Sequence, residues 1–250
     1  MKKIGIVGGA AWQSTAEYYR MLCTWSAAHH QGAGMKGLMP TPPMAIESLV
    51  MRETRALRAA PGSGEAGWAA YDDVIRQALL RLERAGCDFA IIANNTMHTR
   101  LHAITKGVQI DVLSILSASA TAARTTCKQN ALVLGTSVTM RSDDYARALK
   151  AEGLAPNKRL DEAVIDRMQA LIDAEFYADP IGAGAREGLM AMCRAEAPDP
   201  ANTVILLACT ELPLAFPDHL EDPVFVSGGY TFVNTTAAHV QAALDRSLAD

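Results

Sequence analysis

The feature that most constrains the fold of this chain is an internal repeat. Residues 206–213 read LLACTELP, and residues 91–98 read IIANNTMH. In each stretch an apolar run ends directly in small polar residues, which is typical of a buried strand that runs into a loop. Superposing the two stretches places Asn94 opposite Cys209. One half of the chain therefore offers an amide where the other offers a thiol.

A second echo extends the repeat and predicts the architecture. Residues 4–10 (IGIVGGA) open the chain, and residues 131–137 (ALVLGTS) precede the second motif at a broadly similar distance. Strands and helices alternate after both, which predicts parallel sheets with crossover helices. We expect an α/β fold of two pseudosymmetric lobes, each a mainly parallel sheet flanked by helices, with a cleft between them. The predicted lobes are 1–110 together with 228–250, and 111–227.

Composition and charge exclude several classes of partner. The net charge of −4 argues against nucleic-acid binding, and no apolar run approaches the roughly 20 residues that a membrane span needs. The apolar start is broken by Gly8 and Gly9, so it predicts a first strand and not a signal peptide. We therefore expect a soluble, cytoplasmic protein whose partner is a small molecule.

Cysteine spacing and the first turn argue against metals and cofactors. The chain has five cysteines, an odd number without CxxC spacing, so neither a disulfide framework nor a zinc site is predicted. The turn GIVGG lacks the GxGxxG spacing of dinucleotide-binding proteins. We expect no cofactor and no metal.

The predicted site lies at the carboxyl ends of the strands, where open parallel sheets bind ligands. Cys209 is the candidate reactive group, because a thiol near the start of a helix can ionise near neutral pH and take a proton from carbon. Thr210 could orient the substrate. Glu211 could bind a ligand amine or favour the start of a helix, and both alternatives stay open.

Other candidates follow from position and residue type. Arg52 could clamp a carboxylate, since a guanidinium pairs bidentately with one, or it could lie on a solvated face. His98 and His239 lie near strand-end loops, where a lone histidine is more often structural than catalytic. The polar groups that could bind a substrate carboxylate are Asn95, Thr96, Thr136, Ser137 and Thr139.

These motifs together resemble the aspartate/glutamate racemase family, whose members work without pyridoxal phosphate and consist of two pseudosymmetric lobes. The sequence GGAAWQSTAEYY resembles the family's opening loop, ANNTMH its first cysteine motif, LGTSVTMRSDDY its middle block, LACTELP its second cysteine motif and FVNTTAAH its closing segment. The resemblance runs in order along nearly the whole chain. It implies the two-lobed fold, an acidic amino acid as substrate, and a homodimer.

The resemblance also implies a mechanism from which this chain departs. In that family one thiolate removes the α proton and a second thiol protonates the opposite face. Cys209 matches the second cysteine, but Asn94 occupies the place of the first, and an amide has no proton to exchange near neutral pH. Asn234 stands where the family has aspartate.

Three functions follow as hypotheses. The first is a racemase-type isomerase that works at the carbon next to a carboxylate, with Cys209 as base or acid and a water, Thr96 or another group on the opposite face. The second resembles arylmalonate decarboxylase, with Cys209 alone protonating the carbanion that remains after loss of CO₂. The third is a non-catalytic binder of a dicarboxylate or amino acid.

Overall fold

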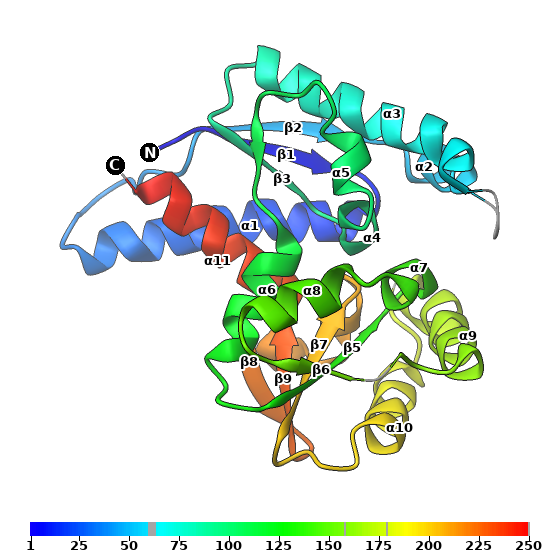
Figure 1. The fold of residues 1–250 in the computed structure, drawn as a ribbon. Coiled ribbons are helices and arrows are strands. Elements are labelled where there is room, and N and C mark those ends of the chain that lie inside the picture. The colour runs from blue at the N-terminus through cyan, green and yellow to red at the C-terminus, as the bar shows by residue number, and fades with distance from the viewer. Residues whose placement is uncertain (60–63, 158, 179, 250) are drawn as a thin grey trace. The chain divides into compact units, whose positions relative to one another are not determined.

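The computed structural model describes residues 1–59, 64–157, 159–178 and 180–249, and the chain divides into two compact units (Figure 1). The first unit comprises residues 1–114 and 240–250, and the second comprises 115–239. The second unit therefore extends beyond the predicted boundary at residue 228, to residue 239. The physical reason is that residues 230–234 form a strand of the second sheet, so the chain leaves that unit only afterwards.

The sheet of the first unit is parallel, with the strand order β2-β1-β3-β4. Val7, Ala90 and Ile92 face one helix-covered side of this sheet, where they pack against the apolar stripe of α3. Helix α1 covers the opposite side (Figure 1). Its strands are β1 (Ile4–Gly8), β2 (Met44–Ser48), β3 (Phe89–Ile92) and β4 (Asp111–Val112). Its helices are α1 (Trp12–Gly32), α2 (Met51–Ala56), α3 (Gly64–Arg84), α4 (Asn95–His98), α5 (Leu101–Ile104) and the later part of α11 (Thr235–Leu248).

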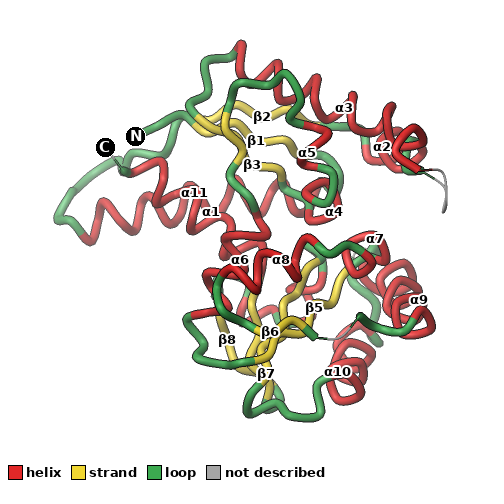
Figure 2. Tube along the Cα trace, viewed as in Figure 1, coloured by secondary structure: helices red, strands yellow, loops and turns green. Residues whose placement is uncertain are grey.

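The second unit has the strand order β6-β5-β7-β9-β8, and Figure 2 shows its strands flanked by helices. The pairs β5–β6, β5–β7 and β7–β9 are parallel, whereas β8–β9 is antiparallel. Its strands are β5 (Asn130–Gly135), β6 (Ala155–Pro156), β7 (Thr203–Ala208), β8 (Val224–Ser227) and β9 (Tyr230–Asn234). Its helices are α6 (Ile115–Arg124), α7 (Ser137–Arg141), α8 (Asp144–Ala151), α9 (Glu162–Leu171), a π-helical turn (Ile172–Phe176), α10 (Ala185–Glu196) and the 3₁₀ turns Leu212–Ala215 and Pro217–His219.

After their first residues, Asn130 and Thr203, strands β5 and β7 of the second unit are apolar, because both of their faces are buried. Leu134 and Leu207 belong to the core that α9 and α10 cover. Val133 and Leu206 belong to the core on the other face, which α6 and α8 cover. Continuing the alternation along β7 places Cys209 on the α9 side, and its side chain does pack in that core.

The internal repeat is present in the sheets with a consistent register. Pairing joins Val7 to Ile92 in the first sheet and Leu134 to Leu207 in the second. The two sequence echoes, which were aligned independently, equate Val7 with Leu134 and Ile92 with Leu207. The order β2-β1-β3-β4 then corresponds to β6-β5-β7-β9, with β8 as an addition. The predicted α/β class with mainly parallel sheets is confirmed.

Several strands differ from what the sequence pattern predicts. The sequence of residues 44–51 predicts a single strand, but β2 ends at Ser48 and α2 begins at Met51. The short strands β4 and β6 were not predicted, and neither was β9. The apolar residues 224–226 predict a last strand, and they lie in β8, which runs antiparallel to β9. Within the described residues, no helix is long and apolar enough to cross a membrane.

Candidate functional site

The carboxyl ends of β5 and β7 lie against each other at the candidate site of the second unit. Gly135 pairs with Ala208 in the parallel ladder. A Cβ atom on Gly135 would lie 2.4 Å from the carbonyl oxygen of Ala208, so only glycine permits this approach. The next residues along the two strands are Thr136 and Cys209, and the close contact therefore holds these two side by side.

The thiol of Cys209 is paired with a carboxylate. Its Sγ atom donates to Oε2 of Glu211 across 2.9 Å, and both side chains are buried. The hydroxyl of Thr210 donates to Oε1 of the same carboxylate across 3.0 Å. The helix that was expected after Cys209 is a single 3₁₀ turn, which begins after Glu211. In this structure Glu211 accepts hydrogen bonds from the two residues before it.

The hydroxyls predicted to bind a carboxylate surround the start of α7. Thr136 caps this helix, with its Oγ1 accepting from the amide of Thr139 and lying 3.0 Å from the Thr139 hydroxyl. The amide N–H of Ser137 donates to Oε1 of Gln169 on α9 across 2.8 Å. That N–H is therefore already occupied by the Gln169 side chain.

At the corresponding edge of the first unit, two of the loops that follow the strands are in contact. Gly9 adopts φ = +80°, and a Cβ atom there would lie 2.0 Å from the carbonyl oxygen of Leu49. The loop after β1 therefore touches the loop after β2. Arg52 follows this second loop, but it lies on α2 and not at a strand end, and its side chain is exposed.

Asn94 has a structural role of its own in the first unit. Its Oδ1 accepts from the amide of Met97 across 2.9 Å and so caps α4. Because Oδ1 is engaged in the cap, the group that Asn94 can offer to a ligand is its Nδ2 donor. Asn95 and Thr96 in the next turn are buried.

His98 is buried and packed against the backbone of the same loop. Its Nδ1 lies 2.8 Å from the carbonyl oxygen of Asn94. Burial lowers the pKa of His98 to about 4, against the smaller opposing effect of backbone hydrogen bonds to Asn94 and Leu113. His98 is therefore neutral at physiological pH and supports the loop structurally. The other candidate histidine, His239 on α11, is also buried.

We expect the buried His98 to make the protein acid-sensitive. Above pH 6.5 the ring is neutral in both folded and unfolded chains. As the pH falls from 6.5 to about 4, His98 binds a proton in the unfolded chain but stays neutral in the folded chain. The free energy of unfolding should therefore drop by about 3 kcal/mol. Urea unfolding of wild type and His98→Gln at pH 7.5 and 4.5 would measure this. The variant should lose less stability on acidification, whereas parallel losses would contradict the assignment.

Arg100, which the sequence reading did not single out, anchors the same loop to α3. Its guanidinium forms paired hydrogen bonds with Asp72, at 2.7 and 3.1 Å, and with Glu65, at 2.7 and 2.8 Å. The Glu65 and Asp72 carboxylates raise the pKa of Arg100 above its ordinary value. Asp72 is buried, so losing Arg100 would leave an uncompensated buried charge, typically a loss of about 3–5 kcal/mol.

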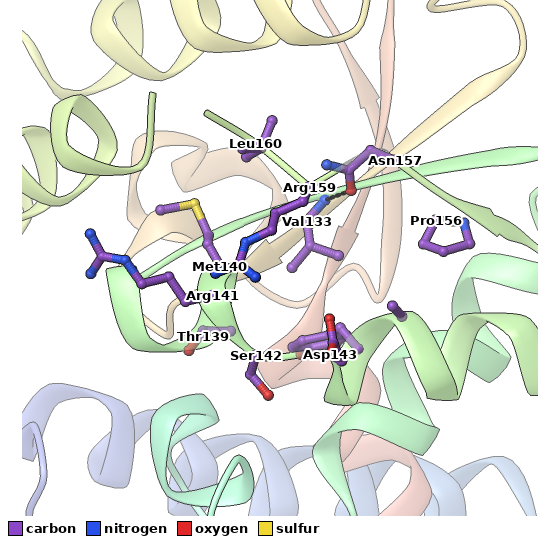
Figure 3. Close-up of a pocket in the computed structure, with 12 residues that line it drawn as sticks. Val133, Thr139, Met140, Arg141, Ser142, Asp143, Pro156, Asn157, Arg159 and Leu160 are labelled. Atoms are coloured by element: carbon purple, nitrogen blue, oxygen red, sulfur yellow. Dashed lines mark hydrogen bonds between the residues drawn. The ribbon is translucent and has the colours of Figure 1, made fainter. Parts of the chain in front are cut away.

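A small cavity of about 80 Å³ lies beside α7 in the second unit (Figure 3). Thr139, Arg141, Ser142, Asn157 and Arg159 contribute polar groups to its lining. Arg141 is committed to ion pairs with residues 162 and 166 of α9. Of the predicted site residues only Thr139 lines this cavity, so it is separate from the Cys209 pair. Among the described residues no His, Cys, Asp or Glu cluster could hold a metal ion.

The predicted residues thus form two groups, one in each unit. In the second unit the structure places Thr136 and Glu211 beside Cys209. In the first unit Asn95 and Thr96 directly follow Asn94, whereas Arg52 lies on the separate helix α2. That the two groups face each other across one cleft stays a prediction. Gln169 was missed, because a glutamine inside an amphipathic helix, far along the chain from α7, carries no sequence signal. The first group consists of Arg52, Asn94, Asn95 and Thr96, and the second of Thr136, Ser137, Thr139, Cys209, Thr210 and Glu211.

Nearly the whole chain is similar to one family of proteins. The sequence model of the Asp/Glu/hydantoin racemases matches residues 7–243. A Yersinia pestis protein assigned to the Asp/Glu racemases is 23% identical, with a TM-score of 0.78 over 100% of both chains. An aspartate racemase homologue from Pyrococcus horikoshii OT3 is 24% identical, with a TM-score of 0.72 over 99% of both chains.

Two further solved structures share the fold at lower identity. An aspartate racemase from Picrophilus torridus is 17% identical with a TM-score of 0.71, over 99% of this chain and 94% of that one. A glutamate racemase from Campylobacter jejuni is 17% identical with a TM-score of 0.57, over 99% and 87%. The match of the family model over almost the full length shows that this chain belongs to the Asp/Glu/hydantoin racemase family.

Proposed function

We propose that this protein is a cofactor-independent isomerase that moves a proton at the carbon next to a carboxylate of an aspartate- or glutamate-like substrate. Cys209 is the proton carrier. The observation that carries this proposal is the contact of 2.9 Å between the Cys209 thiol and the Glu211 carboxylate at the carboxyl edge of a parallel sheet. We also propose that the protein is a cytoplasmic homodimer and that its substrate is a small carboxylic or amino acid.

The pair of side chains can give and take a proton without a cofactor. When the thiol proton moves to Glu211, the Cys209 thiolate can remove the proton from the substrate carbon, and the electron pair of that C–H bond stays on the carbon. The reverse step returns a proton from the thiol to the same face. The pair carries one negative charge in both states, because two adjacent anions in a buried site would repel each other.

Inversion at the carbon needs a second proton carrier on the opposite face. Asn94 stands where the family resemblance implies the other thiol, and its Oδ1 is engaged in capping α4. Its Nδ2 group can hold a substrate oxygen but cannot exchange a proton near neutral pH. A water or the Thr96 hydroxyl would have to serve that face.

One further candidate function is favoured because position 94 has an amide that caps α4 and offers no thiol. In a decarboxylase with a single thiol, the bond to a carboxylate carbon breaks, CO₂ leaves, and the electron pair remains on the substrate carbon. The Cys209 thiol then protonates that carbon, and no carrier is needed on the other face. The non-catalytic binder is the outcome that remains if no chemistry occurs.

Isotope exchange tests the proposed function directly. Incubation of L-aspartate, L-glutamate and phenylmalonate with the protein in D₂O should place deuterium on the reacting carbon of a substrate, which NMR detects. Inversion without CO₂ supports the isomerase, and CO₂ release supports the decarboxylase. Absence of exchange, inversion and CO₂ release with all three acids would contradict the proposed isomerase.

Arg52 is proposed as a carboxylate clamp at the edge of the first unit. A charge-assisted hydrogen bond contributes about 1.5–3 kcal/mol, so Arg52→Ala should weaken substrate binding roughly 10- to 150-fold. Titration calorimetry with the turned-over acid measures the change, and Arg55→Ala on the same helix is the matched control. Equal affinities for wild type and Arg52→Ala would assign Arg52 to the solvated surface.

A further inference from the structure

Gln169 on α9 is hydrogen-bonded to the loop that follows β5, although no sequence motif includes it. Met168, directly before it, and Ile172, three residues after it, pack in the same core as Cys209. Its Oε1 accepts the amide N–H of Ser137 across 2.8 Å. Ser137 follows Thr136, which the ladder between β5 and β7 places beside Cys209. The Gln169 amide is thus held at Ser137, the residue after Thr136, and Thr136 is the neighbour of Cys209.

The orientation of this amide is fixed by its partner. A backbone N–H can only donate, so the atom of Gln169 that meets Ser137 is the carbonyl oxygen. The other end of the planar amide is then Nε2 with its two N–H donors. In the described parts of the chain no acceptor for Nε2 is found, and the side chain is partly exposed. A donor therefore stands ready beside the loop that follows β5.

Charge at this edge of the second unit makes a neutral donor useful. The residues that directly follow β5 and β7 include two hydroxyl residues on one strand and Cys209, Thr210 and Glu211 on the other. Glu211 brings a negative charge, and none of these residues brings a positive one. A substrate carboxylate bound here has to be held by N–H and O–H donors that lie away from Glu211.

We propose that Gln169 is a specificity-determining residue whose Nε2 group donates to the substrate carboxylate, while its Oε1 stays anchored to Ser137. This inference rests on the proposed function, and it names the group that reads the carboxylate. The hydroxyl of Thr136 would bind the same carboxylate from the neighbouring strand end. The amide thus selects an anionic substrate group without adding a charge next to the thiol.

The variant Gln169→Glu separates this role from a structural one. The glutamate side chain has the same shape and can still accept from Ser137, but it replaces the Nε2 donor by an anionic oxygen. The thermal midpoint should therefore stay close to that of wild type. The KM for the carboxylic acid that wild type turns over, among L-aspartate, L-glutamate and phenylmalonate, should rise about 10- to 100-fold, with a smaller change in kcat.

A pH profile and a control sharpen the test. The KM ratio of variant to wild type should narrow as the pH falls from 8 toward 5, because protonation of the new carboxylate, with an ordinary pKa of about 4.3, restores a donor. Ala170→Glu adds the same charge at the next, exposed position and should leave KM unchanged. An active wild type with unchanged KM in Gln169→Glu, or an equal rise in Ala170→Glu, would overturn the inference alone. A wild type that neither binds nor turns over any of the three acids would overturn the proposed function, and this inference with it.

Discussion

Replacing Cys209 by serine is expected to lower the rate of proton exchange about 10²- to 10⁴-fold, the range that a positioned general acid or base contributes. The serine hydroxyl can keep the hydrogen bond to Glu211 that the thiol makes at 2.9 Å, so the fold should be retained. A serine hydroxyl does not ionise near neutral pH, so it cannot take a proton from carbon. The measurement is deuterium incorporation into the substrate at pH 7.5, under conditions where wild type is saturated.

A matched cysteine replacement controls for general effects of removing a thiol. Cys127 is exposed, and Cys127→Ser should keep the wild-type rate. Circular dichroism of both variants checks that they are folded. If Cys209→Ser exchanged deuterium as fast as wild type, the reactive group would have to lie elsewhere, and the proposed mechanism would fail.

Replacing Asn94 by cysteine is expected to raise racemisation of aspartate or glutamate about 10²- to 10⁴-fold, because it supplies the proton carrier that the second face lacks. The same change removes the side-chain cap of α4, the hydrogen bond from the Met97 amide to Asn94, which should lower the free energy of unfolding by about 1 kcal/mol. Activity and stability should therefore move in opposite directions. Chiral chromatography of the product and urea unfolding measure the two effects.

Asn94→Ser is the control for this gain. Serine can cap α4 as asparagine does, but it brings no thiol, so the variant should be about as stable as wild type without any rise in racemisation. Adding Cys209→Ala to Asn94→Cys should remove the activity again. No gain in Asn94→Cys, together with wild-type turnover of a different carboxylic acid, would show that the site is adapted to another substrate.

Much of the sheet architecture was predictable because it depends on strong, local signals. Strands β1, β3, β5 and β7 are buried on both faces, so their sequences are continuous apolar runs that end in glycine or polar residues. The repeat between residues 91–98 and 206–213 also aligned the two halves in the register that the strand pairs show. The short strands β4 and β6 escaped prediction because two residues carry no periodicity.

The contacts of the site were predictable only where the residues are close in sequence. Cys209 and Glu211 are close in sequence, so their contact follows from one tight turn. The hydrogen bond from the Ser137 amide to Gln169 joins residues from separate elements, and only the packing of α9 on the second sheet brings them together. Asn94 stabilises the start of α4 by capping it, which explains how asparagine fits a position where the family resemblance implies cysteine.

The discontinuous first unit has a consequence for the order in which the protein can fold during synthesis. Domains tend to fold as units while the chain emerges, and residues 115–239 are complete before residue 240 appears. The first unit still lacks residues 240–249 at that time. Ser247 later exchanges hydrogen bonds with the backbone of Lys2, at 2.8 and 2.7 Å, and Arg246 pairs with Asp111. The first unit to be synthesised is therefore the last to be completed, and it depends on the end of α11.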